Sequence, residues 1–173
     1  SSWNQIGDDI DGEASGDYSG HSVSLSSDGN TVAIGAPDND GNGTNAGHIR
    51  IYNYNGSSWT QLGQDIDGEA AADQSGCSVS LSGDGNIVAI GADRNDGNGV
   101  NSGHVRIYSW NGSSWTQLGQ DIDGEATDDK SSGGTGISLN GDGTIIAIGA
   151  RHNDGNGGES GHVRIYNYNG TYW

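Results

Sequence analysis

The sequence predicts an all-β fold built from three repeated units, and three observations lead to this fold class. Trp3, Trp59 and Trp115 open three similar segments that lie 56 residues apart (59 − 3 and 115 − 59), and a period of this size is typical of repeat architectures. Within each segment, short runs of alternating apolar and polar residues are separated by Asp-Gly and Asn-Gly, the pattern of strands joined by hairpin turns. No segment shows the periodicity of an amphipathic helix.

Composition and pattern point in opposite directions. The chain has 173 residues, a formal net charge of −17 and no Phe, and only 27 of its residues are Leu, Ile or Val. Few large apolar residues together with a high net charge are typical of a disordered chain. The regular alternation of apolar and polar residues in every unit favours an ordered sheet instead.

The second unit shows how the strands are expected to run. The four expected strands are residues 78–81, 86–91, 104–108 and 115–118. Gly83, Asp84 and Gly85 form a strong hairpin turn between the first two strands. Ala89 and Gly91 are small enough to let a neighbouring sheet approach closely. Four short strands per unit are typical of one blade of a β-propeller.

We therefore predict a single repeat domain over residues 1–173, in which each unit is a blade of four antiparallel strands. The units cover approximately residues 3–58, 59–114 and 115–173. The units are expected to stack side by side, because one blade cannot bury its apolar faces alone.

Two sequence motifs stand out in the units. The first, Ser-Gly-x-Ser-Val-Ser-Leu, begins at Ser19 and Ser75 and, altered, at Gly133. The second, Val-Ala-Ile-Gly-Ala-Pro at residues 32–37, is followed by Gly-His-Ile-Arg-Ile-Tyr at 47–52. These motifs resemble the FG-GAP repeat of integrin-type β-propellers in its bacterial, short-loop form. The resemblance covers essentially the whole chain and implies a propeller with outward loops that serves adhesion or ligand binding.

One feature of that family does not carry over to this sequence. Integrin-type repeats often hold calcium in a loop of Asp and Asn between the first two strands. Here only the tight turn 27–30 and its copies 83–86 and 141–144 stand at that place. A tight hairpin cannot surround a cation with six or more oxygens.

Three blades are too few to close a ring, because propellers typically have four to eight. The chain starts at a fourth strand, residues 3–6, and stops just after a third strand, residues 164–166. We expect a homodimer with six blades, in which each N-terminal strand completes a blade of the partner. A homotrimer with nine blades is the alternative, and so is a fragment of a longer propeller.

The acidic segments between the units are the candidate metal site. Alternate carboxylates beside a glycine turn offer the oxygen ligands that Ca²⁺ takes, although the spacing does not match an EF-hand loop. The alternative is that these acids cap turns or pair with the repeated Arg50, Arg106 and Arg164. The candidate calcium ligands are Asp9, Asp11, Glu13, Asp65, Asp67, Glu69, Asp121, Asp123 and Glu125.

The repeated histidines are expected to belong to the scaffold. His48, His104 and His162 occupy the same place in every unit, two residues before an arginine. Residues two apart on a strand share one face of the sheet. We interpret these histidines as members of a hydrogen-bond network between blades.

Positions that differ between the units are the candidate ligand site, since repetition of a residue in every unit points to the scaffold. The equivalent positions His21, Cys77 and Thr135 start the inner strands and are expected to line the mouth of a central channel. The second set, which includes Arg94, Arg151 and His152, lies in the loop after the second strand of each unit. The candidate ligand residues are His21, Cys77, Thr135, Arg94, Arg151 and His152.

These observations favour a non-catalytic, self-assembling scaffold or adhesion module. A multivalent lectin-like module that binds glycans or peptides, with or without Ca²⁺, is the alternative. No asymmetric acid/base pair stands out, so we expect no enzyme. The acidic surface disfavours nucleic acid and anionic membranes, and no apolar run is long enough for membrane insertion. No signal peptide is visible, and extracellular or cell-surface conditions would suit the composition.

Overall fold

The computed structural model describes residues 2–134 and 136–173. In this part of the chain, thirteen β-strands form three antiparallel sheets, and no helix is present. The predicted all-β class is thereby confirmed. None of the described residues belongs to a helix long and apolar enough to cross a membrane.

The first sheet runs in the order β1-β2-β3-β4. Its strands are β1 (Ser22–Leu25), β2 (Thr31–Ala36), β3 (His48–Tyr54), β4 (Trp59–Gln61) and β5 (Ile66–Asp67). The short β5 also pairs with β3, with Ile66 opposite Ile49 and Asp67 opposite His48. The outer edge of β3 is therefore covered by two successive strands from the next segment of the chain.

The second sheet repeats this arrangement. Its strands are β6 (Ser75–Leu81), β7 (Ile87–Ala92), β8 (His104–Trp110), β9 (Trp115–Gln117) and β10 (Ile122–Asp123). Both β9 and β10 pair with β8. The four strands expected from the sequence are present, and the additional two-residue strand forms because Ile122, 6% exposed, is buried beneath the edge of β8.

The third sheet has three strands, in the order β11-β12-β13. These are β11 (Ile137–Leu139), β12 (Ile145–Ala150) and β13 (His162–Asn167). No described strand pairs with the outer edge of β13. At the other end of the chain, residues 2–21 form no strand, so the fourth strand expected at residues 3–6 is not present. Among the described residues, the outer edges of β3 and β8 are thus covered by short strands, whereas that of β13 is not.

Carboxylates hold the tight turns between the first two strands of each sheet. Asp28 accepts hydrogen bonds from the Ser26 hydroxyl at 2.6 Å and from the Asn30 backbone N–H at 3.0 Å. These hydrogen bonds lower the pKa of Asp28, with the bond from Ser26 as the main cause. Asp84 accepts the equivalent bonds from Ser82 and Asn86, and Asp142 accepts bonds from both the backbone N–H and the hydroxyl of Thr144. The turn carboxylates satisfy their own backbone, as expected for Asp-Gly hairpins.

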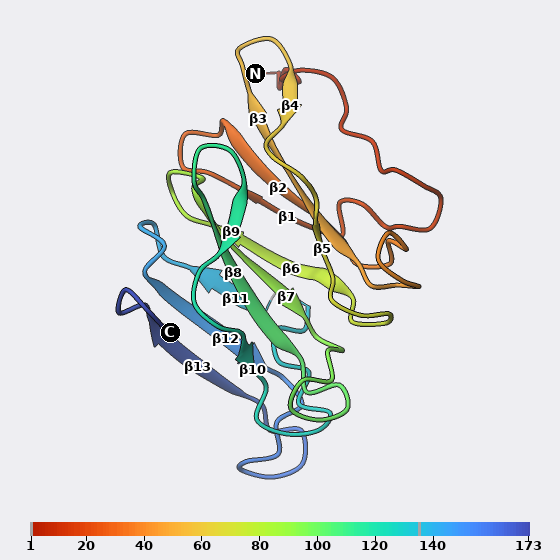
Figure 1. The fold of residues 1–173 in the computed structure, drawn as a ribbon, viewed down its shortest axis with the longest axis vertical. Coiled ribbons are helices and arrows are strands. Elements are labelled where there is room, and N and C mark those ends of the chain that lie inside the picture. Colours follow the sequence, from red (N-terminus) through yellow and green to blue (C-terminus); the bar gives the residue numbers. More distant parts are fainter. Residues whose placement is uncertain (1, 135) are drawn as a thin grey trace.

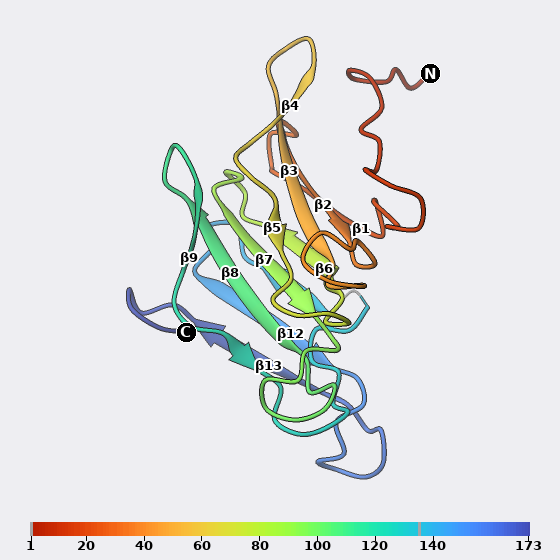
Figure 2. The same cartoon turned by 45° about the vertical axis from the view of Figure 1, so that its right-hand side comes forward.

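The three sheets stack one after another, as Figures 1 and 2 show. Two apolar cores lie between them. The first core joins Ile49 and Ile51 of the first sheet to Leu81 and Ile90 of the second. The second core joins Val105 and Ile107 of the second sheet to residues of β11 and β12. At each of these two junctions, the facing apolar side chains of neighbouring sheets are buried against each other, as repeat stacking requires.

The stack is open, and its two terminal faces expose apolar side chains. On β1, Val23 is 64% exposed and Leu25 is 60% exposed. On β13, Val163 is 66% exposed and Ile165 is 71% exposed. Figure 1 places β13 at one end of the stack and the sheet that contains β1 at the other. These two surfaces are called the β1 face and the β13 face below.

Small residues let the sheets approach closely. A Cβ added at Gly91 would lie 2.6 Å from Ser132 Oγ and 2.7 Å from Ser132 Cβ. A Cβ at the equivalent Gly35 would overlap the Gly76 carbonyl of the second sheet. The absence of a side chain at these two positions sets the spacing between neighbouring sheets.

We expect Gly91→Ala to lower the free energy of unfolding by about 1–3 kcal/mol, the usual cost of overpacking a tight interface. Urea denaturation followed by Trp fluorescence measures this change. Gly141→Ala is the matched control, because a Cβ there meets nothing within 4 Å, and it should leave the midpoint unchanged. Equal midpoints for the two variants would show that the sheet spacing is not set at Gly91.

Candidate functional site

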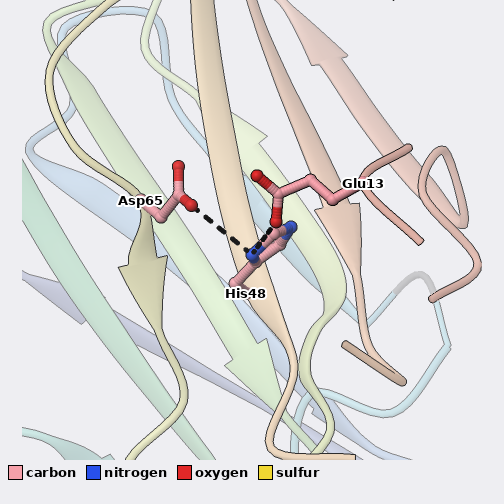
Figure 3. Close-up of side chains that lie close together, drawn as sticks. All are labelled: Glu13, His48 and Asp65. Carbon is pink, nitrogen blue, oxygen red and sulfur yellow. Dashed lines mark ion pairs between the residues drawn. The ribbon is translucent and has the colours of Figure 1, made fainter. Parts of the chain in front are cut away.

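Two carboxylates and one imidazole, which come from the first and second units of the repeat, lie close together (Figure 3). His48 lies on β3, Asp65 lies directly before β5, and Glu13 comes from the N-terminal segment. His48 Nδ1 is 3.8 Å from Glu13 Oε2 and 3.9 Å from Asp65 Oδ2. The imidazole is 2% exposed, whereas the carboxylates are 46% and 30% exposed. The imidazole of the cluster is therefore buried, whereas its two carboxylates are accessible to solvent.

The same cluster recurs one unit later. His104 Nδ1 is 3.9 Å from Glu69 Oε2 and 3.9 Å from Asp121 Oδ2, and the imidazole is again 2% exposed. Burial, followed by the positive charge of Arg106, lowers the pKa of His104 below its usual range. Its imidazole is therefore neutral at pH 7, with a lone pair available on one nitrogen.

Each carboxylate presents one oxygen to the imidazole and gives the other to a second partner. Asp65 Oδ1 accepts a hydrogen bond from Gln61 Nε2 at 2.5 Å, and Asp121 Oδ1 accepts one from Gln117 at 2.6 Å. Glu69 Oε1 is 3.4 Å from Arg106 Nη1. In the first cluster, Asn39 Nδ2 also makes a long contact of 3.5 Å to Glu13 Oε2.

A third, incomplete copy lies at the open end. His162 Nδ1 is 3.6 Å from Glu125 Oε2, and the imidazole is 27% exposed. No aspartate of the described chain joins this pair. Asp9, the equivalent of Asp65 and Asp121 by the 56-residue repeat, lies at the opposite end of the stack, where its Oδ1 accepts a hydrogen bond from Gln5 at 2.8 Å.

The remaining linker aspartates act through their backbone. The carbonyl oxygens of Asp11, Asp67 and Asp123 accept hydrogen bonds of 2.6–2.7 Å from the repeated arginines. Each guanidinium lies 5.5–5.7 Å from the ring centroid of the tyrosine two residues later, within cation–π range. The predicted pairing of linker acids with arginines is therefore present beside the clusters, at Glu13, Glu69 and Glu125.

The nine predicted calcium ligands thus divide into three groups. The side chains of Glu13, Asp65, Glu69 and Asp121 join a cluster, and that of Glu125 faces His162. The side chains of Asp9, Asp11, Asp67 and Asp123 join no cluster of the described chain. The sequence analysis assigned the histidines to the scaffold and did not group them with these carboxylates. Their recurrence at spacings of 56 and 58 residues, close to the 56-residue spacing of the carboxylates, was the signal that could have included them.

The candidate ligand residues are mostly brought together. His21, Cys77, Arg94 and Arg151 all line one cavity of about 440 Å³. His152 does not line it; its Nδ1 lies 3.6 Å from Glu159 Oε1. Thr135 lies outside the described residues. The positions that vary between units therefore meet at one place, although ligand binding there stays a prediction.

Cys77 is a buried thiol and is not a candidate nucleophile. Its side chain is 6% exposed, and Sγ lies 3.4 Å from the Gly91 carbonyl oxygen and 3.7 Å from that of Ser132. Burial, with a smaller contribution from the charge of Asp93, raises the pKa of Cys77 to about 12. Only the thiolate is nucleophilic, so the thiol is inert at neutral pH.

We expect native protein at pH 8 to react with a thiol reagent such as Ellman's reagent at least about 100-fold more slowly than a free cysteine, because almost none of Cys77 is thiolate there. Protein unfolded in urea should react rapidly and release one equivalent per chain, which serves as the internal control. Rapid native labelling would mean that the cavity gives solvent access to Sγ.

The fold and the site define a repeat protein of stacked antiparallel sheets with one polar cluster at each closed junction. Residues 10–52 and 66–108 each match the family model described as the FG-GAP repeat. The chain belongs to the FG-GAP repeat family, as its two motifs indicated.

The comparison with solved structures supports the fold alone. A protein from Bacteroides uniformis that carries the provisional name of a 6-phosphogluconolactonase superposes with a TM-score of 0.54 at 17% sequence identity. The similarity covers 87% of this chain and 38% of that one. No curated protein matches the sequence.

Proposed function

We propose that the chain is a non-catalytic scaffold module that binds its own copies head to tail and so closes a ring of β-propeller blades. The observation that carries this proposal concerns the packing between neighbouring sheets. It occurs at two junctions within the chain, and the matching face on β13 is exposed. An extracellular or cell-surface setting, where FG-GAP repeats typically act, belongs to the same proposal.

The β13 face repeats a surface that is buried in the other two sheets. Val163 and Ile165 are equivalent to Val105 and Ile107, which are 0% and 1% exposed beneath the third sheet. The first sheet buries Ile49 and Ile51 in the same way beneath the second. Only the copies on β13 lack a covering sheet within the described chain.

The β1 face repeats the opposite half of that interface. Val23 and Leu25 are equivalent to Val79 and Leu81, and Leu81 is 6% exposed where it packs against the first sheet. The β1 face of one copy is therefore the surface that covers the β13 face of another, by the same contacts that join neighbouring sheets within the chain.

The strand edges are complementary as well. β5 pairs with β3 through Ile66 opposite Ile49 and Asp67 opposite His48. By the same register, Ile10 of one copy would lie opposite Val163 of another, and Asp11 would lie opposite His162. Trp173 already takes the position equivalent to Trp59, with its indole N–H donating to the Leu118 carbonyl at 2.8 Å. The added segment therefore consists of residues 5–11.

Two copies satisfy both contacts in a closed ring. A head-to-tail interface either closes into a ring or continues into an open filament. Two chains supply six blades, within the usual range of propellers, whereas three would supply nine. Closure leaves no β13 edge unpaired, and unpaired edges favour aggregation.

We expect Ile165→Asp to convert a dimer into a monomer. Burying a carboxylate in place of an isoleucine at each contact should weaken association by at least about 3 kcal/mol, roughly 100-fold. Light scattering coupled to size exclusion at micromolar concentration measures the mass. Val100→Asp, at a 59% exposed loop valine, is the matched control and should remain a dimer. A monomeric wild-type chain would overturn the proposal.

A second candidate function, glycan or peptide binding, is favoured by aromatic pairs at one edge of every sheet. Tyr54 and Trp59 have ring centroids 5.2 Å apart, and Trp110 with Trp115 and Tyr168 with Trp173 repeat the pair at 5.4 and 5.1 Å. Three equal sites would suit a repeating ligand through avidity. However, the indole N–H groups of Trp59, Trp115 and Trp173 each donate to a backbone carbonyl 53–55 residues earlier in the chain, which favours a structural role.

A glycan array, with and without Ca²⁺, separates the two candidates. The scaffold proposal predicts no binding to any glycan. If binding occurs and is lost in Trp110→Ala, the aromatic pairs are a ligand site. The parallel mass measurement shows whether the protein binds glycans in addition to assembling or instead of it.

A further inference from the structure

The two Glu–His–Asp clusters are the groups of the described chain in which three metal-ligating side chains converge. In each, the possible ligand atoms all lie within 4.8 Å of one another. We propose that Glu13, His48 and Asp65, and equivalently Glu69, His104 and Asp121, each bind one divalent transition-metal ion of the zinc class.

The separations suit an ion better than a direct hydrogen bond. Nδ1 lies 3.8–3.9 Å from each carboxylate oxygen, which is too long for a hydrogen bond. A tetrahedral zinc ion with ligand distances of about 2.1 Å holds its ligand atoms about 3.4 Å apart. The nitrogen–oxygen separations are close to this value, and all three ligand atoms lie within 4.8 Å of one another. An inward movement of the carboxylates would therefore supply three of the four ligands of a tetrahedral ion.

The buried histidines are an independent indication of a ligand. His48 and His104 are each 2% exposed, and no hydrogen bond joins either imidazole to another described side chain. A buried polar group normally has a partner. In both clusters, Nδ1 is aimed at the space between two carboxylates, where an ion would supply that partner.

The donor set selects the class of ion. One imidazole nitrogen and two carboxylate oxygens suit zinc and its neighbours, which accept nitrogen ligands and low coordination numbers. Calcium takes six to eight oxygens and no imidazole is needed for it. The two carboxylates outweigh the nearby guanidinium in charge, and the net charge of −17 attracts cations to the surface.

Hydrogen bonds from two glutamines orient the aspartates of the clusters. Gln61 and Gln117 hold one oxygen of Asp65 and Asp121 and leave the other facing the imidazole. Such outer hydrogen bonds orient metal ligands and raise affinity. Asp9 already has the corresponding bond from Gln5, although no imidazole of the described part of its own chain faces it.

The proposed association would complete a third site, and this part of the inference rests on the proposed function. Glu125 and His162 lie 3.6 Å apart at the open end. Pairing residues 5–11 of a second copy with β13 would bring Asp9 of that copy to the place that Asp65 and Asp121 take in the other clusters. A closed assembly would then hold three ions per chain, and a separated chain would hold two.

The experiment is a titration of metal-free full-length protein with ZnCl₂ at pH 7, using calorimetry for the number of ions and native mass spectrometry as a second measure. We expect three ions per chain for the wild type and two for Ile165→Asp. Asp9→Asn should remain associated and lose the third ion. In these titrations, Ca²⁺ in large excess should not displace zinc.

Near-isosteric changes at the accessible ligands test the first two sites without removing a buried side chain. Glu13→Gln and Glu69→Gln should each lose one ion, and the double variant should lose two. Glu159→Gln, at a histidine–carboxylate pair without a third ligand, is the control and should lose none. Substitution with Co²⁺ should give visible absorption bands that weaken in the same variants.

The outcomes separate the two proposals. No zinc binding, unchanged stoichiometry in Glu13→Gln and Glu69→Gln, or displacement by Ca²⁺ would overturn the transition-metal sites. Two ions per chain in an associated wild type would overturn only the third site. A monomeric wild type that binds two ions would overturn the association and leave the first two sites standing.

Discussion

The structure depends on one interaction, the packing of each sheet against the next through a thin layer of aliphatic side chains. No sheet has a core of its own, because Ile49, Ile51, Val105 and Ile107 lose their solvent exposure only beneath the neighbouring sheet. The chain has few such residues for its length and carries a high negative charge. Concentrating them at the sheet junctions, where each contributes fully to burial, allows a composition close to that of disordered proteins to fold.

Most of the strands could be predicted from the sequence, because local patterns determine them. Alternation at residues 78–81, the apolar run within residues 86–91 and the Asp-Gly turn between them fix strand and turn positions. The small side chains at Ala89 and Gly91 indicated close packing that the structure contains. The short β5 and β10 could not be predicted. A two-residue strand has no periodicity, and it forms only because Ile66 and Ile122 reach a buried place beside another strand.

The sequence predicted several of the carboxylates of the candidate site, but it did not predict which residues come together. Spacing along the chain placed Asp9, Asp11 and Glu13 together, since they alternate within one linker. In the structure the linker contributes to separate places: Glu13 faces His48, whereas the Asp11 carbonyl accepts from Arg50. The partner carboxylate, Asp65, lies 52 residues from Glu13 (65 − 13). Only the sheet register, with Asp67 opposite His48, brings it there, and register between distant segments is not visible in a single sequence.

The pairing register of the covering strand also links the Glu–His–Asp clusters to the proposed association of copies. The segment that covers the edge of a third strand carries the aspartate of its cluster, so edge pairing and cluster completion are one event at each junction. Where the edge is covered, the histidine is 2% exposed, and where it is open, at His162, it is 27% exposed. An ion at a completed cluster would hold together the linker, the strand edge and the third strand, and at the outer junction these would belong to two copies. Metal affinity at that junction would therefore add to the free energy of association, because an ion that binds only the closed form shifts the equilibrium toward it.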